Sequence, residues 1–336
     1  MNKFKNIQAY RLGPLLPIID LLFIFPVLLY LKHKSTKSIE LHYLGDRKQI
    51  ELDIKKGAFF MTNHRDICMD SAWLTYLLFL RYGIHPYIGI GNNLFGKWWI
   101  QHVVRTLRAF VVIRNGNFRD QVSNAKLLSE YIHHLRKRRK SIWLAQREGR
   151  AKDGNDVTQP GVLKMLTIDS DNFFESIKQL NICPVCISYE YDPCDYLKAR
   201  EMQLKRDKPG WKKSRKDDLV SMQVGINGKK GRMVYRMTPS INHDIDQALA
   251  ENPELLKLSK NEQIQFVCNL IDQHIHAAYE IYERGEKFDQ YIEGQIAKIN
   301  LSNKDENYLR EKLYEMYHNQ VKNYEKVQLA ELVELD

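Results

Sequence analysis

A histidine and two aspartates lie within seven residues of one another in the segment 62–70, Thr-Asn-His-Arg-Asp-Ile-Cys-Met-Asp. Histidine titrates near neutral pH, so His64 can take a proton from a substrate hydroxyl. A carboxylate bonded to the second ring nitrogen would fix the tautomer and stabilise the imidazolium. Asp66 and Asp70 both compete for this role, and a helix cap beside an exposed histidine would give the same pattern. The segment alone predicts a candidate base and leaves its partner open.

Two arginine positions follow strand-like runs further along the chain. Arg114 closes the apolar run 109–113, and the run 142–145 is soon followed by Glu148, Gly149 and Arg150. Glycine allows close backbone approach to a ligand, and a guanidinium grips phosphate oxygens in a bidentate way. A base and two arginines at strand ends suit the transfer of an acyl group onto a hydroxyl of a phosphorylated acceptor.

The elements that must position these residues alternate between strand-like and helix-like patterns. We expect strands at 58–61, 87–90, 109–113, 141–145, 182–189 and 232–237, and helices between them at 71–82, 94–107 and 118–136. This alternation predicts an α/β fold with a central, largely parallel sheet flanked by helices, whose ligands gather at strand ends. Gly89 and Gly91 do not begin a dinucleotide-binding fingerprint, because the next glycine is Gly96.

With a fourth strand-like segment at 183–190, four segments stand in order between Asn63 and Glu190. In this order the chain resembles the superfamily of glycerol-3-phosphate and 1-acylglycerol-3-phosphate (lysophosphatidate) acyltransferases, over somewhat more than a third of its length. The resemblance implies that His64 is a general base and that Asp70, which ends the first segment, orients it. The segment from Cys183 onward would line the site.

The resemblance also implies the substrates. By this resemblance, the phosphate of the acceptor would be contacted by Arg114 and by Glu148, Gly149 and Arg150. The acceptor would be glycerol-3-phosphate or 1-acylglycerol-3-phosphate, in phospholipid biosynthesis. The donor would be an acyl thioester of coenzyme A or of acyl-carrier protein, as co-substrate. No cofactor and no metal ion are expected, because a thiolate is already a good leaving group.

The sequence departs from the usual pattern of that superfamily in three places. One residue more than usual separates His64 from Asp70, and Arg150 follows Gly149 directly where another residue usually intervenes. Arg108 stands where the second segment usually has a glycine. The two spacing changes each shift a loop by one residue, which a loop ahead of a helix or strand can absorb.

The charge of the chain favours an anionic partner. The 336 residues carry a formal net charge of +10, with basic clusters at 136–140 and 205–216. Acidic phospholipid or the phosphates of coenzyme A would suit the second cluster, with Trp211 as an interfacial anchor, although a solvated face gives the same pattern. Proteins that bind single-stranded nucleic acid place aromatic side chains among the basic ones, so that bases can stack on them. The two clusters lack this pattern, so nucleic acid is not expected as a partner. The competing class is an acyltransferase-like basic protein with a non-catalytic site that binds a membrane surface or nucleic acid.

The chain has five scattered cysteines, an odd number without the spacing of a disulfide framework. This indicates a reducing compartment. Cys183 and Cys186 form a C-x-x-C, but residues three apart in a strand point to opposite faces, so they are not expected to share a metal. Cys68 is expected to pack against its neighbours.

The N-terminal segment 12–31 is apolar apart from Asp20 and is flanked by cations. A clean membrane span needs ~20 apolar residues, and Asp20 and three prolines argue against one here. We expect a kinked helix in the membrane interface or a hydrophobic hairpin, with a buried core helix as the alternative. No small-residue cleavage site follows, so a removable signal peptide is not expected. This segment and Trp98–Trp99 would receive acyl chains.

The expected domains are a membrane-interacting helical segment (1–38), the α/β acyltransferase domain (39–245) and a helical C-terminal extension packed on the core (246–336). Long helices are expected in the extension at 260–284 and 302–333, the second with Leu309, Leu313 and Tyr317 on one face. The expected location is the cytoplasmic face of a membrane, peripheral or N-terminally anchored.

Overall fold

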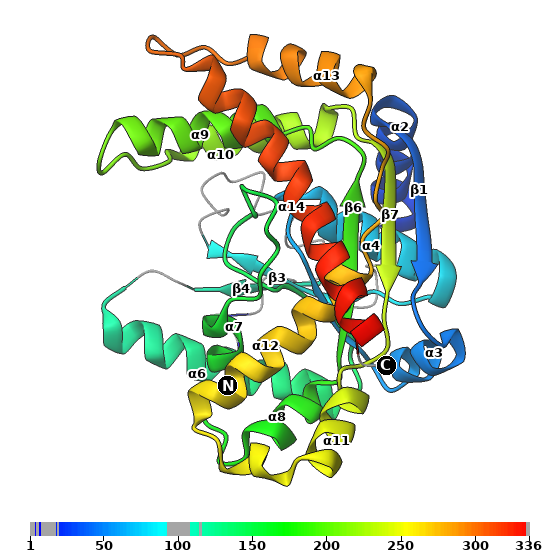
Figure 1. Ribbon diagram of the computed structural model, residues 1–336. Coiled ribbons are helices and arrows are strands. Elements are labelled where there is room, and N and C mark those ends of the chain that lie inside the picture. The colour runs from blue at the N-terminus through cyan, green and yellow to red at the C-terminus, as the bar shows by residue number, and fades with distance from the viewer. Residues whose placement is uncertain are drawn as a thin grey trace.

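The computed structural model describes residues 20–92, 108–113 and 116–333, together with residues 4, 7 and 18. The expected helix at 94–107, the pair Trp98–Trp99 and Arg114 lie outside the described residues. The fold is α/β, as expected, with a seven-stranded sheet at its centre and helices around it (Figure 1). The strands are β1 (Thr36–Tyr43), β2 (Phe59–Thr62), β3 (Tyr87–Gly91), β4 (Ala109–Val112), β5 (Ile142–Ala145), β6 (Ile182–Tyr189) and β7 (Gly231–Met237).

The strand order in the sheet is β1-β7-β6-β2-β5-β3-β4. Every described pair is parallel except β6 with β7, so the expectation of a largely parallel sheet is confirmed. Six strands match the expected runs to within about two residues at either end. β1 was missed, although Ile39, Leu41 and Tyr43 alternate there with polar residues in the period of a strand.

Helices cover both faces of the sheet and extend beyond it. They are α2 (Phe25–Ser35), α3 (Arg47–Lys55), α4 (Met69–Tyr82), α6 (Phe118–Lys137), α7 (Pro160–Leu166), α8 (Phe173–Leu180), α9 (Asp195–Asp207), α10 (Arg215–Asn227), α11 (Asn242–Glu251), α12 (Lys260–Ala277), α13 (Glu286–Ala297) and α14 (Glu306–Val333). A π-helical turn, η2 (Asp20–Ile24), precedes α2, and a 3₁₀ turn, η4 (Pro253–Lys257), follows α11.

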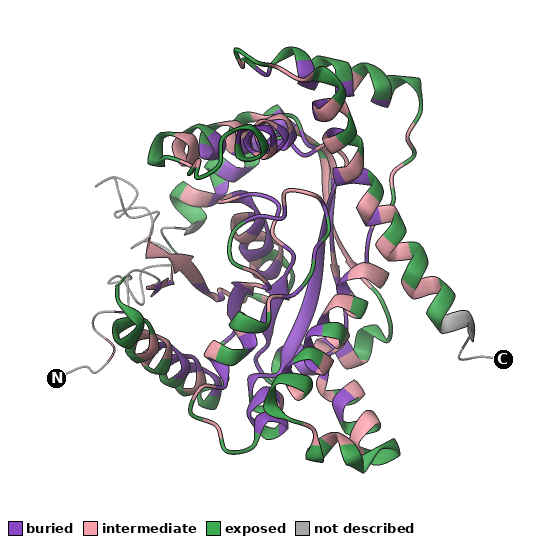
Figure 2. Cartoon of the chain, turned by 60° about the vertical axis from the view of Figure 1, so that its left-hand side comes forward, coloured by how far each residue is buried: buried purple, intermediate pink, exposed green. Residues whose placement is uncertain are grey.

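The sheet separates two hydrophobic clusters, because alternate side chains of a strand point to opposite faces. Phe59 and Met61 of β2 belong to the cluster under α6, α7, α8 and α12, whereas Phe60 belongs to the cluster under α2 and α4. Cys183 and Cys186 of β6 likewise fall in different clusters, so their side chains point to opposite faces as expected. Burial is concentrated in the strands and the inward faces of the helices (Figure 2).

The late helices differ from the expected boundaries. The helix expected at 260–284 ends at Ala277, and α14 begins at Glu306 rather than 302. The first expectation was wrong because Tyr279 and Tyr282 turn their hydroxyls to Asp156 and to the Ser188 carbonyl, which takes the chain out of a helical path. The expected domain boundaries at 38 and 245 fall inside β1 and α11, and the division of the chain stays a prediction.

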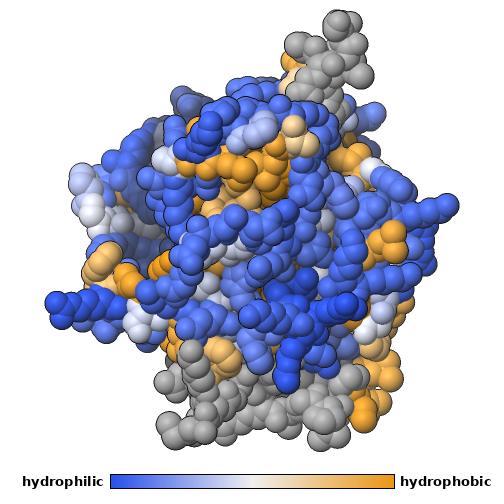
Figure 3. Space-filling view, turned by 90° about the horizontal axis from the view of Figure 1, so that it is seen from below, coloured by the Kyte–Doolittle hydropathy of each residue, from blue (hydrophilic) through white to orange (hydrophobic). Residues whose placement is uncertain are grey.

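Seen from below, the surface is mostly hydrophilic, with hydrophobic side chains gathered in separate patches (Figure 3). At the N-terminal end of the described chain, η2 and α2 expose large apolar side chains: Leu21, Leu22, Phe23, Val27 and Tyr30. Among the described residues, no helix combines the length and apolar character needed to cross a bilayer.

Candidate active site

The segments predicted to carry the chemistry come together at the carboxyl ends of β2 and β5. The two strands are parallel, with Thr62 opposite Ala145, so the residues that follow each strand emerge side by side. The backbone bonds continue past the strands: the Gln146 amide donates to the Thr62 carbonyl (2.8 Å) and the Ala151 amide to the His64 carbonyl (3.1 Å). The histidine segment and the Glu148–Arg150 segment therefore form one unit of backbone structure.

His64 is paired with Asp70. Its Nδ1 lies 2.9 Å from Oδ2 of Asp70, which is fully buried, while the histidine side chain is 14% exposed. An ionised carboxylate only accepts, so Nδ1 carries the proton and Nε2 is left as a basic atom. The ring of Trp143 meets the imidazole edge to face, with 6.3 Å between ring centroids, and restricts its rotation. This arrangement has the form of a general base with its orienting acid.

Asp70 is held by four donors in addition to its place in the first turn of α4. Oδ2 accepts from His64 and from the amides of Arg65 (2.7 Å) and Asp66 (2.9 Å), and Oδ1 accepts from the Tyr189 hydroxyl (2.9 Å). The loop before α4 thus wraps its own amides around the carboxylate. The extra residue between His64 and Asp70 is absorbed in this loop.

Asp66, the rival partner, does not contact the imidazole ring. Its Oδ1 caps α4 by accepting from the amides of Cys68 and Met69, both at 2.9 Å. The pairing expected from the resemblance is therefore confirmed. Asp66 is 1% exposed, and Oδ2 has no hydrogen-bond partner among the described residues. Burial, followed by the nearby charge of Asp70, raises its pKa.

A buried polar network that sequence reasoning missed supports the base. The Oδ2 atom of Asp156 accepts from the amide of Asn63 (3.0 Å), from the Arg65 guanidinium (2.5 Å) and from the Tyr279 hydroxyl (2.8 Å). Asn63 also exchanges two bonds with the backbone of Ile187 in β6. Residues on both sides of His64 are thereby fixed to distant parts of the chain.

The predicted phosphate-binding segment divides into an exposed and a buried part. Glu148 and Gly149 are exposed, and Gly149 has φ +70°, a backbone conformation that favours glycine. Arg150 is only 8% exposed, and its Nη1 has no hydrogen-bond partner among the described residues. Burial by itself lowers the pKa of Arg150, but Cys194, Asp66 and Asp192 around it raise the pKa overall. Arg150 thus balances the negative charge of the buried acids around it.

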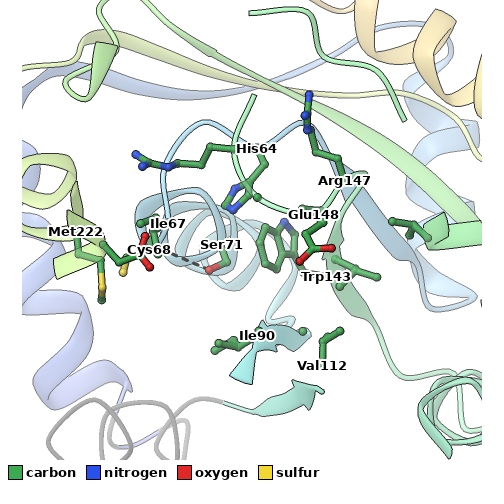
Figure 4. Close-up of a pocket in the computed structure, with 18 of the residues that line it drawn as sticks. His64, Ile67, Cys68, Ser71, Ile90, Val112, Trp143, Arg147, Glu148 and Met222 are labelled. Atoms are coloured by element: carbon green, nitrogen blue, oxygen red, sulfur yellow. Dashed lines mark hydrogen bonds between the residues drawn. The ribbon is translucent and has the colours of Figure 1, made fainter. Parts of the chain in front are cut away.

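A cavity of about 1190 Å³ opens beside His64. Its walls are mostly apolar, and His64, Glu148, Gly149 and Arg150 all line it. In the close-up view, Ser71 and Trp143 lie beside His64 and Glu148 lies next to Trp143, whereas the side chain of Arg147 extends away from the ring (Figure 4). The structure thus brings His64, Glu148, Gly149 and Arg150 to one cavity, while Asp70 is buried behind His64 and does not line it.

The charged rim of the cavity carries more cations than carboxylates. The cations are Arg147, Arg150, Lys152, Lys205 and Lys213, and the carboxylates are Glu148, Glu201 and Asp218. Lys152 and Lys205 share Glu201, and Lys213 pairs with Asp218 at 2.6 Å. Arg147 was missed by the sequence reasoning, although it directly precedes the predicted segment. An apolar cavity with a cationic rim suits an anionic ligand that carries a hydrocarbon chain.

Cys68 also lines the cavity. Burial, followed by the charges of Asp66 and Asp70, raises the pKa of its thiol to about 12. Since the thiolate is the reactive form, these surroundings disfavour Cys68 as a nucleophile. Within the part of the chain that the structure describes, no group of histidines, cysteines and carboxylates has the arrangement of a metal site.

No model of a known protein family matches the chain, and a search of curated proteins finds no similar sequence.

Proposed function

We propose that this protein is an O-acyltransferase of phospholipid biosynthesis. It moves a fatty acyl group from the thioester of coenzyme A or acyl-carrier protein to a hydroxyl of glycerol-3-phosphate or 1-acylglycerol-3-phosphate. The observation that carries the proposal is the pair of His64 and Asp70, 2.9 Å apart, at the wall of a large apolar cavity with a cationic rim.

His64 acts as the general base. Its Nε2 takes the proton of the acceptor hydroxyl as the hydroxyl oxygen attacks the thioester carbonyl carbon. The new C–O bond gives a tetrahedral oxyanion, and its collapse breaks the C–S bond and expels the thiolate. The proton on Nε2 then passes to the thiolate, so that an ester and a free thiol leave and the base is regenerated. Asp70 keeps Nε2 unprotonated at the start and stabilises the imidazolium during the step.

Arginine side chains hold the acceptor phosphate. Arg150 lines the cavity, and so does Arg147, three residues before it in the chain. A guanidinium in the wall of a cavity binds phosphate with charge-assisted bonds. Arg114 has the same role in the proposal, on the resemblance alone.

The N-terminal helix brings the cavity to a lipid surface. Leu22, Phe23 and Val27 are each more than half exposed, whereas Ile24, in the same turn, lines the cavity. Lys32 and Lys34 follow in the last turn of α2, where they suit anionic lipid. We place the protein on the cytoplasmic face of a membrane, with residues 1–38 in contact with it and residues 246–336 as a helical extension of the core.

The test is thiol release from palmitoyl-CoA and palmitoyl-acyl-carrier protein against a panel of glycerol phosphate and lysolipid acceptors. Release that requires one of these acceptors, together with formation of the ester, supports the proposal. Binding to anionic vesicles without thiol release from either donor would favour the competing class, a surface-binding protein with a non-catalytic site.

The membrane contact has its own test in vesicle flotation. Replacing Phe23 and Val27 together by serine should weaken binding to anionic vesicles by about tenfold or more, since each buried side chain contributes roughly 1.5–3 kcal/mol. Leu329→Ser is the matched control, because Leu329 is equally exposed but lies on α14. Equal loss in the two variants would contradict the role of η2 and α2.

A further inference from the structure

The cavity beside His64 reaches over the edge of the sheet onto both of its faces. Trp143 and Leu144 are neighbours on β5 and point to opposite faces, yet both line the cavity. A ligand site on one face of the sheet would contact only one of them. The cavity therefore has two apolar compartments, which meet at the carboxyl ends of the strands.

The first compartment, here called the α7 compartment, lies on the face covered by α6 and α7. Its walls are Val112, Leu128, Leu144, Val162 and Met165, all of which belong to or pack on the hydrophobic cluster of that face. Val162 and Met165 are only partly buried, so their side chains face open space in the cavity.

The second compartment, here called the α10 compartment, lies on the opposite face, between α4 and α10. Its walls are Ile67, Ala72, Ile90, Leu219, Met222 and Ile226, which belong to or pack on the two hydrophobic clusters there. Lys205 of α9 and Lys213, just before α10, stand at the rim.

His64 stands where the two compartments meet. In the close-up, Ile67, Cys68 and Met222 lie on one side of its ring and Val112 on the other (Figure 4). One long chain running through both compartments would pass its methylenes across the base and leave no place for the acceptor hydroxyl. Two chains that enter from opposite sides would instead bring their polar ends together at Nε2.

The size of the cavity agrees with two chains. Its volume of about 1190 Å³ exceeds the roughly 300–1,000 Å³ of most small-molecule sites, and its walls are mainly apolar in both compartments. Glycerol-3-phosphate has no hydrocarbon to place against such a wall. A second apolar compartment is therefore of use only to an acceptor that already carries an acyl chain.

We propose that the α10 compartment holds the acyl chain of the donor and the α7 compartment holds an acyl chain on the acceptor. The acceptor is then a monoacylated glycerol phosphate rather than glycerol-3-phosphate. Lys205 and Lys213 stand beside the donor compartment, where the phosphates of the thioester carrier would lie. Val112 of the acceptor compartment is the last residue of β4, two residues before Arg114 in the sequence. This inference rests on the proposed acyl transfer at His64.

Two variants, each filling one compartment, test the proposal. Val162→Phe narrows the α7 compartment and Ile226→Phe the α10 compartment, both at partly buried positions with open space in front of them. Each variant is the matched control of the other. Thermal unfolding verifies that both are folded, and KM is measured for palmitoyl and octanoyl forms of donor and acceptor.

Val162→Phe should raise the KM of the palmitoyl acceptor about tenfold or more, with little change for the octanoyl acceptor or for either donor. Ile226→Phe should do the same for the palmitoyl donor and spare the acceptors. The wild-type protein should prefer the monoacylated acceptor to glycerol-3-phosphate by at least about tenfold in kcat/KM.

The inference is overturned if glycerol-3-phosphate is the better acceptor, if both variants impair the same substrate, or if their effects are exchanged. A binding measurement keeps it separate from the proposed function. Calorimetric titration with palmitoyl-lysophosphatidate should give weaker binding to Val162→Phe than to Ile226→Phe, whether or not the acyl group is transferred. Absence of thiol release with every acceptor defeats the proposed function, whereas equal binding to both variants defeats the two compartments.

Discussion

The hydroxyl of Tyr189 donates a 2.9 Å hydrogen bond to Oδ1 of Asp70, the oxygen that does not face His64. Burial, followed by the charge of Asp70, raises the pKa of Tyr189 well above its ordinary value, so the hydroxyl keeps its proton and remains a donor. Tyr189 thus orients the carboxylate of Asp70, which in turn orients the imidazole of His64. It is a positioning residue that the substrate does not need to touch.

Tyr189→Phe should lower turnover about tenfold, because a hydrogen bond to a charged group is worth about 1.5–3 kcal/mol. It should also move the acid side of the rate–pH profile to higher pH, since Asp70 then directs more of its charge at the imidazolium. Tyr282→Phe is the control, because that hydroxyl bonds the backbone carbonyls of Ser188 and Arg232 and not the Asp70 carboxylate. Identical rate–pH profiles for the two variants would assign Tyr189 a packing role only.

The two aspartates of the loop should respond differently to the same substitution. Asp70→Asn should lower turnover by roughly 10³ to 10⁴, because the amide can donate to Nδ1 and favour the wrong tautomer. Asp66→Asn keeps an oxygen for the amides of Cys68 and Met69 and should stay within about threefold of the wild-type turnover. Steady-state kinetics on both variants measure this. A larger loss in Asp66→Asn than in Asp70→Asn would reverse the roles.

Arg150→Lys should raise the KM of the phosphorylated acceptor by about tenfold or more and leave the KM of the donor nearly unchanged. A lysine keeps the charge that balances Asp66 and Asp192 but loses the planar fork that binds phosphate in a bidentate way. Binding to anionic vesicles depends on total charge and should not change. Unaltered acceptor kinetics would remove Arg150 from the phosphate site.

Asp195 should make the stability of the fold depend on pH. Burial, followed by the charge of Asp192, raises its pKa to about 7, although the hydroxyls of Tyr291 and Tyr317 donate to it at 2.7 and 2.8 Å. Between its ordinary pKa and 7, the folded chain holds a proton that the unfolded chain has lost. Its contribution to stability therefore falls as pH rises, by about 1.4 kcal/mol per pH unit, and levels off above pH 7.

Urea unfolding of the wild type and of Asp195→Asn, from about pH 5 to pH 8, measures this contribution as the difference between the two curves. The asparagine variant should lack the fall with rising pH. Parallel curves would show that Asp195 ionises normally in the folded chain.

The strands could be read from the sequence, but their order in the sheet could not. Runs such as 182–189 are apolar and rich in β-branched residues, which fixes a strand locally. The antiparallel pairing of β6 with β7 and the place of β1 at the edge are decided by contacts between distant segments. The end of α12 at Ala277 was misjudged for the same reason, since Tyr279 leaves the helix to reach Asp156.

At the site, the sequence predicted the contact between residues that are close together in the chain. His64 and Asp70 are six residues apart and belong to one loop and helix start, so their pairing could be predicted. Tyr189 is 119 residues from Asp70, and Asp156 is 93 residues from Asn63. Neither contact leaves a trace in residue spacing, because each depends on how β2, β5 and β6 are arranged in the sheet.

The most direct test of the account is the rate of acyl transfer by His64→Ala. Single-turnover thiol release, with donor bound and acceptor in excess, should fall by roughly 10² to 10⁴ relative to the wild type, the usual contribution of a positioned general base. His42→Ala, on the partly exposed edge strand β1, should transfer at the wild-type rate. Thermal unfolding should be similar in all three proteins. Wild-type transfer by a folded His64→Ala would contradict the proposed mechanism.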